Sequence, residues 1–249
     1  RHVVLLPANM RECFEFGWRA HDLADYLQTP IFVLSDLDLG MNLWMTDPFE
    51  YPDQPLNRGK VVSFEDLEKF GTWGRYKDVD GDGIAYRSLP GQGPAYFARG
   101  TGHTEYATYS ERPDDWTKNL DRLARKHDTA RRLVPQPVSQ IADEATCGII
   151  AYGSSDAAIT EARDLLKAVG VATSYHRLRA LPLGEATHEF MGLYERIYVV
   201  ENNYLGQMAQ LLKMEYPAFA DRIISISHCD GLPLTARWIT DSILEKEQK

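Results

Sequence analysis

The chain has 249 residues, of which 44% are hydrophobic and 25% charged, a balance typical of globular proteins with a packed core. This length is enough for one large domain or two ordinary ones. The formal net charge of -9 argues against nucleic-acid binding, because an acidic surface repels phosphates. No apolar run approaches the roughly 20 residues that cross a bilayer, and no signal peptide is visible, so we expect a cytoplasmic protein.

The first 34 residues predict a strand, a helix and a second strand. Residues 3–6 are an apolar strand, after which Asn9 is a suitable N-cap and Glu12 completes a capping box. Apolar residues then recur at helical spacing until a Thr-Pro pair stops the helix. Residues 31–34 are uniformly apolar, which predicts a parallel strand buried on both faces. Because the chain opens with Arg1 and enters a strand at once, we expect that upstream chain has been removed or is not included.

The middle of the chain is irregular. Residues 35–112 are rich in Gly, Pro, Asp and aromatics, and only 64–70 predict a short helix. A long irregular region of this kind is usually functional or forms an interface. Helical spacing returns over 114–132. The proline-rich stretch that follows predicts a linker, so we expect two domains, 1–133 and 140–249, joined at 134–139.

Strands and helices alternate more clearly in the last part. The pattern predicts strands at 148–152, 172–178, 197–200 and 223–226, and helices at about 159–169 and 205–214. Gly170 is placed to cap the first of these helices. Such alternation predicts a parallel sheet with right-handed crossovers, so the fold class is α/β.

The string Asp78-Val79-Asp80-Gly81-Asp82-Gly83 allows two metal interpretations. As a calcium loop of the EF-hand kind it lacks the bidentate Glu at the twelfth position, which is Leu89, and no helix pattern flanks it. As a thiamine-type Gly-Asp-Gly motif it follows a charged turn rather than an apolar strand, and no suitably placed Asn follows. A tight surface turn is favoured. Asp78, Asp80 and Asp82 stay as candidate ligands of an incidental divalent ion.

A glycine-rich loop spans residues 99–105, after an apolar stretch. Its glycines let the backbone approach another group closely. His103 and Glu105 are therefore candidates for proton chemistry or for binding a cofactor, an anion or a metal. The alternative, which we favour, is a subunit-contact loop whose polar groups bond the backbone.

Three further features have a structural and a functional interpretation. Residues 153–155 lie where a helix N-terminus could bind an anion, but the full G-x-G-x-x-G is absent and an ordinary turn is favoured. Glu201, with two Asn after it, ends a strand, where open α/β sheets place ligands or where local hydrogen bonds cap the chain. The spacing does not separate these two. His176 lies within a predicted strand, and a lone strand histidine is more often structural.

The three cysteines, Cys13, Cys147 and Cys229, lie far apart and form no C-x-x-C. An iron–sulfur cluster usually takes about four thiolates, so we expect no cluster on this chain. Reduced, buried thiols are the expectation.

Longer strings resemble one known family. Those at 34–42, 58–61, 74–84 and 99–103 resemble, in the expected order, the alpha subunits of 2-oxoacid:ferredoxin oxidoreductases, and most resemble the 2-oxoglutarate type. The part from 148 through 201–207 to 231–233 is similar to the transketolase C-terminal-like domain of that subunit. The resemblance implies the later portion of a thiamine-diphosphate-binding-type domain followed by a transketolase C-terminal-like domain.

The resemblance also implies an activity. Enzymes of this family cleave a 2-oxoacid oxidatively, use thiamine diphosphate with magnesium and coenzyme A, and pass electrons to ferredoxin. A beta subunit carries the diphosphate contacts and an iron–sulfur cluster. The alpha subunit adds a Glu that activates the thiamine and a Tyr-Pro-Ile-Thr-Pro motif, and that motif is absent from this sequence. No catalytic residue is therefore assigned, and we expect activity only in a hetero-oligomer with a beta subunit.

Two other interpretations stay open. One is a non-catalytic assembly module derived from this family. The other is a different thiamine enzyme, such as a transketolase or a dehydrogenase E1 component, which would share the pattern of the second domain but not the 99–105 string.

Overall fold

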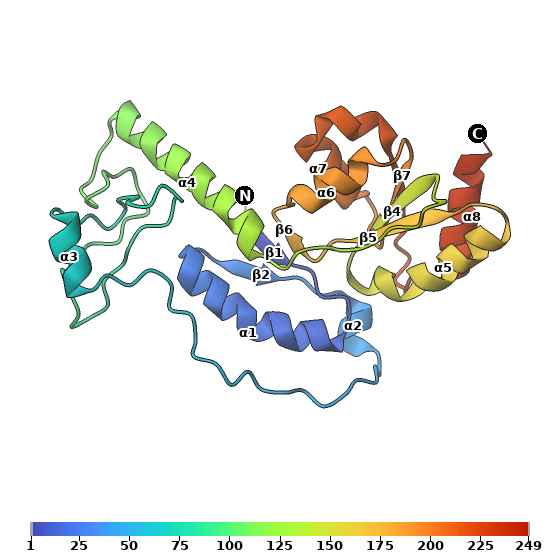
Figure 1. The fold of residues 1–249 in the computed structure, drawn as a ribbon, viewed down its shortest axis with the longest axis horizontal. Coiled ribbons are helices and arrows are strands. Elements are labelled where there is room, and N and C mark those ends of the chain that lie inside the picture. Colours follow the sequence, from blue (N-terminus) through green and yellow to red (C-terminus); the bar gives the residue numbers. More distant parts are fainter. Residues whose placement is uncertain (1, 249) are drawn as a thin grey trace. The chain divides into compact units, whose positions relative to one another are not determined.

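The strands form two sheets in the part of the chain that the computed structural model describes, residues 2–248 (Figure 1). The larger sheet has the strand order β3-β5-β4-β7-β8, and the smaller has the order β2-β1-β6. Helices connect most of the strands of the larger sheet. The predicted α/β class is therefore confirmed.

Two compact units divide the chain. Unit 1 comprises Trp18–Ile31 and Tyr51–Val134, together with the first residues of the chain. Unit 2 comprises Val4–Gly17, Phe32–Glu50 and the chain from Pro135 onward. Two N-terminal segments thus group with the C-terminal part, whereas the sequence analysis assigns them to the first domain.

The larger sheet is the centre of unit 2. Strands β4, β5, β7 and β8 are parallel to their neighbours, and the edge strand β3 runs antiparallel to β5. The β3 strand begins inside the segment predicted to be a linker. The bounds are β3 Val138–Gln140, β4 Cys147–Ala151, β5 Thr173–Arg177, β7 Ile197–Glu201 and β8 Ile223–Ser227.

Four helices cover the two faces of this sheet (Figure 1). The core on one face joins α5 and α8 to the sheet through apolar residues such as Ile159 and Ile239. The core on the other face joins α6 and α7 through residues such as Phe190 and Met208. The helices are α5 Asp156–Ala168, α6 Glu185–Gly192, α7 Gln207–Glu215 and α8 Ala236–Glu247, with short 3-10 turns at Gly153–Ser155 and Pro217–Arg222.

The smaller sheet corrects one prediction. Strand β1 (Val3–Leu5) pairs antiparallel with β6 (Ala180–Leu181), and β2 (Ile31–Val33) lies at its edge. The stretch 31–34 is not buried on both faces: Phe32 is 50% exposed and Leu34 56%. The prediction was wrong because a uniformly apolar sequence does not distinguish a central strand from an edge strand whose side chains are left exposed.

Helices outside the larger sheet mostly follow the predictions. Helix α1 covers Met10–Leu27, α3 covers Phe64–Phe70, and α4 covers Pro113–Leu133. The short α2 helix (Leu37–Met41) was not predicted. The rest of 35–112 has little regular structure, as expected. Within residues 2–248, no helix has the length and apolarity needed to cross a membrane.

Candidate functional site

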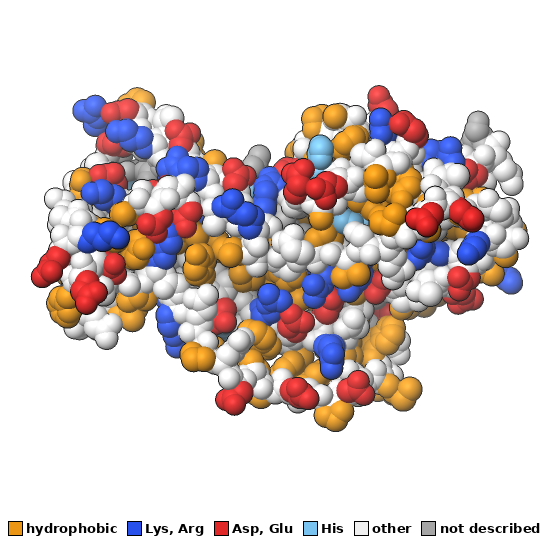
Figure 2. Space-filling view, viewed as in Figure 1, with side chains coloured by type: hydrophobic (Ala, Val, Ile, Leu, Met, Phe, Trp, Pro, Cys, Tyr) orange, Lys and Arg blue, Asp and Glu red, His pale blue; other side chains and the backbone are white. Residues whose placement is uncertain are grey.

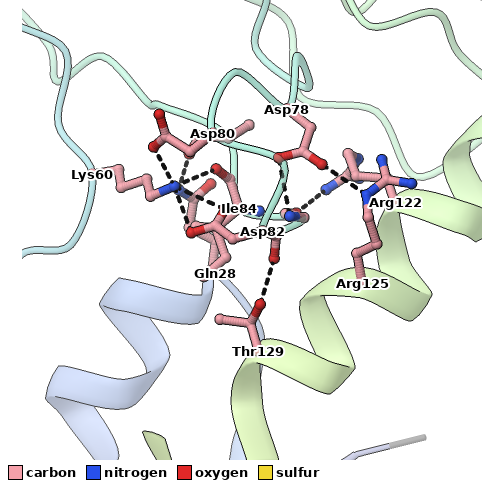
Figure 3. A network of polar contacts seen from close by, with 11 residues as sticks. Gln28, Lys60, Asp78, Asp80, Asp82, Ile84, Arg122, Arg125 and Thr129 are labelled. Atoms are coloured by element: carbon pink, nitrogen blue, oxygen red, sulfur yellow. Dashed lines mark hydrogen bonds and ion pairs between the residues drawn. The ribbon is translucent and has the colours of Figure 1, made fainter. Parts of the chain in front are cut away.

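The Asp-rich turn surrounds the ammonium group of Lys60 (Figure 3). Lys60 Nζ lies 2.6 Å from Asp80 Oδ2, 2.7 and 2.8 Å from the Asp82 carboxylate oxygens, and 3.2 Å from the Ile84 carbonyl oxygen. Burial opposes the charge, but the hydrogen bonds to the two carboxylates raise the pKa of Lys60 above its usual value. A side-chain cation thus occupies the centre of this group of oxygens.

The third carboxylate of the turn also has partners within the chain. Asp78 accepts hydrogen bonds of 3.0 Å from Arg125 Nε and from the Gly83 backbone N–H. Among residues 2–248, no three His, Cys, Asp or Glu side chains come together as metal ligands. The geometry supports a turn whose carboxylates pair with Lys60 and Arg125 rather than a metal site at Asp78, Asp80 and Asp82.

The turn is docked on helix α4 by close backbone contact (Figure 3). Gly83 has a φ of +81°, and a Cβ atom there would lie 2.2 Å from the Lys126 backbone nitrogen. Arg122 Nη1 donates to the Gly83 carbonyl oxygen at 3.1 Å, and Thr129 Oγ1 donates to the Asp82 carbonyl oxygen at 2.8 Å. Glycine is needed here because only it combines this φ with this close approach.

His103 is packed into the fold rather than free in solvent. Its ring stacks on Tyr76 with centroids 3.9 Å apart, and its Nδ1 lies 2.9 Å from the Thr104 carbonyl oxygen. Asn119 Nδ2 donates to the His103 carbonyl oxygen at 2.6 Å. Glu105 is exposed at its side chain, while its carbonyl oxygen accepts from Tyr76 N at 2.9 Å. Most of these bonds hold the backbone of the loop.

His103, Glu105 and Asp78 nevertheless share one cleft of about 510 Å³ in unit 1. The other predicted metal candidates, Asp80 and Asp82, do not line it. Sequence analysis missed the α4 side of this cleft. Its signal was the recurrence of polar residues at helical spacing, which are Asp115, Lys118, Asn119, Arg122 and Arg125.

The strand-end carboxylate Glu201 is a helix cap. It is fully buried and accepts hydrogen bonds of 2.8 and 3.1 Å from the backbone N–H groups of Met208 and Ala209, at the start of α7. A carboxylate there satisfies N–H groups that have no partner within the helix and complements the helix dipole. Of the two interpretations that the spacing left open, capping describes this geometry.

The turn before α5 already holds an anion of this chain. The Ser154 backbone N–H donates to Asp36 Oδ2 at 3.0 Å, and Gly153 has a φ of +61°. Asp36 also caps α2 by accepting from the Leu39 N–H at 3.0 Å. The favoured interpretation, an ordinary turn without a dinucleotide, fits this arrangement.

A buried ion-pair group in unit 2 was not predicted. Glu12 accepts from Arg177 Nη1 at 2.7 Å and Nη2 at 3.0 Å, from Arg179 Nε at 2.7 Å and from the Ala8 N–H at 3.0 Å. The predicted N-cap is confirmed, because the Glu12 N–H donates to Asn9 Oδ1 at 2.9 Å. The carboxylate, however, reaches the backbone N–H of Ala8 rather than that of Asn9, so the expected capping box is modified.

His176 and the cysteines belong to unit 2. His176 is fully buried between Ser139 Oγ at 2.8 Å and Thr187 Oγ1 at 3.1 Å, and burial lowers its pKa to about 4. It is therefore a neutral structural histidine at pH 7. The three cysteines are free thiols. Cys147 is buried, but Cys13 is half-buried and Cys229 exposed, which corrects the expectation that all three are buried.

The chain was compared with known proteins. No family model matches the chain. It is 27% identical over 239 residues to 2-oxoacid:ferredoxin oxidoreductase 2, subunit alpha, of Aeropyrum pernix, which covers 93% of this chain and 36% of the relative. It is 26% identical over 214 residues to 2-oxoglutarate synthase subunit KorA of Methanothermobacter thermautotrophicus, covering 83% of this chain and 54% of the relative.

The homologues of this chain are alpha subunits of 2-oxoacid:ferredoxin oxidoreductases. The resemblance stated from the sequence strings is therefore confirmed. The chain spans between about a third and about half of the length of these alpha subunits.

A solved structure shares the fold. The 2-oxoglutarate:ferredoxin oxidoreductase from Magnetococcus marinus, with 2-oxoglutarate, coenzyme A and succinyl-CoA bound, superposes with a TM-score of 0.85 at 24% identity. The match covers 98% of this chain and 42% of that one. Nearly all of this chain thus has the fold of the corresponding part of that oxidoreductase.

Proposed function

We propose that this chain acts as part of the alpha subunit of a 2-oxoacid:ferredoxin oxidoreductase, with 2-oxoglutarate as the substrate. The observation that carries the proposal is a similarity extending over 93% of the chain to a protein of that name. The 2-oxoglutarate preference is supported by the likeness to a subunit of 2-oxoglutarate synthase. The reaction is oxidative decarboxylation that acylates coenzyme A and passes electrons to ferredoxin.

The described residues do not fit the cofactors of this reaction by themselves. A magnesium–diphosphate site needs oxygen ligands that are free, whereas Glu201 caps α7 and the Asp80 and Asp82 carboxylates bind Lys60. No three ligand side chains gather within residues 2–248. We therefore propose that a beta subunit and further alpha-subunit segments hold thiamine diphosphate with magnesium, and that the iron–sulfur cluster lies on the partner. No catalytic step is assigned to a residue of this chain.

The surface of unit 2 supports a role within an assembly. Figure 2 shows hydrophobic side chains at the lower right of the view, with acidic ones between them, where Figure 1 has α2 and the segment after it. Leu43 and Met45 are 96% and 98% exposed, and Leu37 and Met41 are 69% and 75% exposed. Neighbouring exposed apolar residues of this kind mark protein interfaces. We propose that the partner at this surface is the beta subunit. The resulting hetero-oligomer would bind ferredoxin transiently.

The proposal also covers the domain division of the chain, the role of its glycine-rich loop and its cellular compartment. We retain the domains 1–133 and 140–249 with a linker at 134–139 as the family-type division, and His103 and Glu105 as the residues of this chain that contact a cofactor or partner. We place the complex in the cytoplasm, where the three free thiols would stay reduced.

Reconstitution tests the proposed function. The chain, the beta subunit of the same organism and any remaining alpha-subunit segment are co-expressed and supplied with thiamine diphosphate, magnesium, coenzyme A and ferredoxin. We expect ferredoxin reduction that requires 2-oxoglutarate, and none from the chain alone. A stable complex that does not reduce ferredoxin with any 2-oxoacid supplied would favour the assembly-module alternative. Thiamine-dependent turnover without ferredoxin would point to a different thiamine enzyme.

A further inference from the structure

The cleft in unit 1 has an unbalanced set of charges. Four cationic side chains line it (Lys77, Lys118, Arg122 and Arg125), against three carboxylates (Asp78, Glu105 and Asp115). The aromatic rings of Tyr76 and His103 complete part of the lining. Which of these charges are already paired decides what the cleft can bind.

The three carboxylates have partners within the chain. Asp78 accepts from Arg125 Nε and from a backbone N–H, both at 3.0 Å. Asp115 accepts from Ser110 Oγ at 2.6 Å, and the Glu105 carboxylate is hydrogen-bonded by the Tyr106 hydroxyl. Asp78 forms an ion pair with Arg125, and the four cations of the lining exceed the three carboxylates by one.

Three of the four cations form no ion pair with a carboxylate of the described residues. Lys77 donates to the Thr72 carbonyl oxygen at 3.1 Å. Arg122 donates only to the Gly83 carbonyl oxygen, and its Nε–H is buried with no acceptor among the described residues. Lys118 is exposed and forms no ion pair with a carboxylate of residues 2–248. Arg122 lines the cleft, so an anion bound there would lie beside a guanidinium charge that no described carboxylate pairs.

Two nearby cations increase the positive potential. Burial, followed by the charges of Arg122 and Arg75, lowers the pKa of Lys126 to about 8. Burial and the charge of Arg75 also lower the pKa of Arg122. Like charges held this close in a partly buried region attract an anion, whose presence would relieve their repulsion.

We propose that this cleft is a binding site for a phosphate-type oxyanion, with Arg122 and Lys118 as its principal donors. A guanidinium presents several N–H groups in a planar fork that matches oxyanion geometry, and an ammonium adds a point charge. The inference rests on the charges of unit 1 and does not depend on the proposed function.

The test measures binding of inorganic pyrophosphate to the 249-residue chain by isothermal titration calorimetry at constant ionic strength. We expect saturable binding by the parent chain. Lys118→Ala removes an exposed donor without disturbing packing and should raise the Kd roughly tenfold, as expected for loss of one charge-assisted hydrogen bond. Arg122→Gln should weaken binding further, and its unfolding curve without ligand shows whether the chain remains folded.

A matched control separates a site from general attraction of anions. Arg132 lies in the last turn of the same helix, is exposed and does not line the cleft. Arg132→Gln changes the net charge as Arg122→Gln does and should leave the Kd of pyrophosphate unchanged. Absence of saturable binding by the parent chain would overturn the proposal, and so would an equal loss of affinity in Lys118→Ala and Arg132→Gln.

Discussion

Glu12 is a buried carboxylate that two arginines and a backbone N–H stabilise, so its neutralisation should be costly. Glu12→Gln keeps the shape of the side chain but leaves Arg177 and Arg179 partly unpaired. We expect the free energy of unfolding at pH 7 to fall by about 3–5 kcal/mol, as for other buried ion pairs that lose one partner. Urea unfolding measures this, with Glu161→Gln on an exposed helix face as the control that should change stability little.

The Glu12 carboxylate also makes the stability of the chain depend on pH. Burial opposes ionisation of Glu12, but the hydrogen bonds from Arg177 and Ala8 lower its pKa below the usual 4.5. Its contribution to stability is therefore complete above pH 4.5 and is lost as the pH falls through the lowered value. If the parent chain and Glu12→Gln lost stability in parallel on acidification, this role for Glu12 would be contradicted.

Lys126 gives a pH dependence of the same sign in a more alkaline range. Its pKa, lowered from 10.5 to about 8, means that the folded chain binds fewer protons than the unfolded chain between these values. The free energy of unfolding should therefore rise with pH across that interval. Lys126→Met should remove this rise. The measurement is urea unfolding of both chains at pH 7.5, 9 and 10, and equal pH dependence in the two would contradict the assignment.

Sequence reasoning reached only the residue roles that depend on near neighbours. Asn9 could be predicted as an N-cap because its partner lies three residues away. Asp36 and Ser154 are 118 residues apart, and Glu12 and Arg177 are 165 apart, so no local pattern connects them. The contact of Lys60 with Asp80 and Asp82 could not be predicted for the same reason, because Lys60 lies 20 or more residues before them in the sequence.

At the scale of elements, two glycines of one turn provide a matched pair. Gly81 and Gly83 both have a positive φ, +76° and +81°. A Cβ on Gly81 meets nothing within 4 Å, whereas one on Gly83 would lie 2.2 Å from the α4 backbone. Gly81→Ala should lower the free energy of unfolding by about 1–2 kcal/mol, the cost of left-handed backbone for a residue with a Cβ.

Gly83→Ala should lower the free energy of unfolding by several kcal/mol more than Gly81→Ala does, because steric overlap with α4 is added to the same backbone strain. Thermal unfolding of both variants gives the comparison. Equal losses would mean that the turn does not dock on α4 as described, and that only its backbone conformation matters.

The elements that could be predicted have a strongly periodic pattern of apolar residues or clear turn residues at their ends. Strands β4 and β7 are apolar runs after turns, and α4 regains helical spacing after an irregular stretch. Helix α6 has only eight residues and follows an irregular connection, so its pattern is too short to recognise. Strand β2 shows that an apolar run predicts extended structure better than it predicts burial, because burial depends on what the rest of the fold brings to that face.

At the scale of the whole molecule, the α/β class and the family follow from the sequence, while division into units does not. Residues 4–17 and 32–50 pack with the C-terminal unit, because long-range contacts rather than chain order decide grouping. The exposed apolar residues around α2 are the surface of unit 2 on which the proposed partner would bind.

Affinity purification of the tagged chain from its native host, with intact-mass analysis of everything that co-purifies, tests the central claim most directly. The account predicts a cysteine-rich beta subunit in a stable complex that reduces ferredoxin when given 2-oxoglutarate, coenzyme A and thiamine diphosphate. A chain of 28.3 kDa that purifies alone and gives no such activity would contradict it.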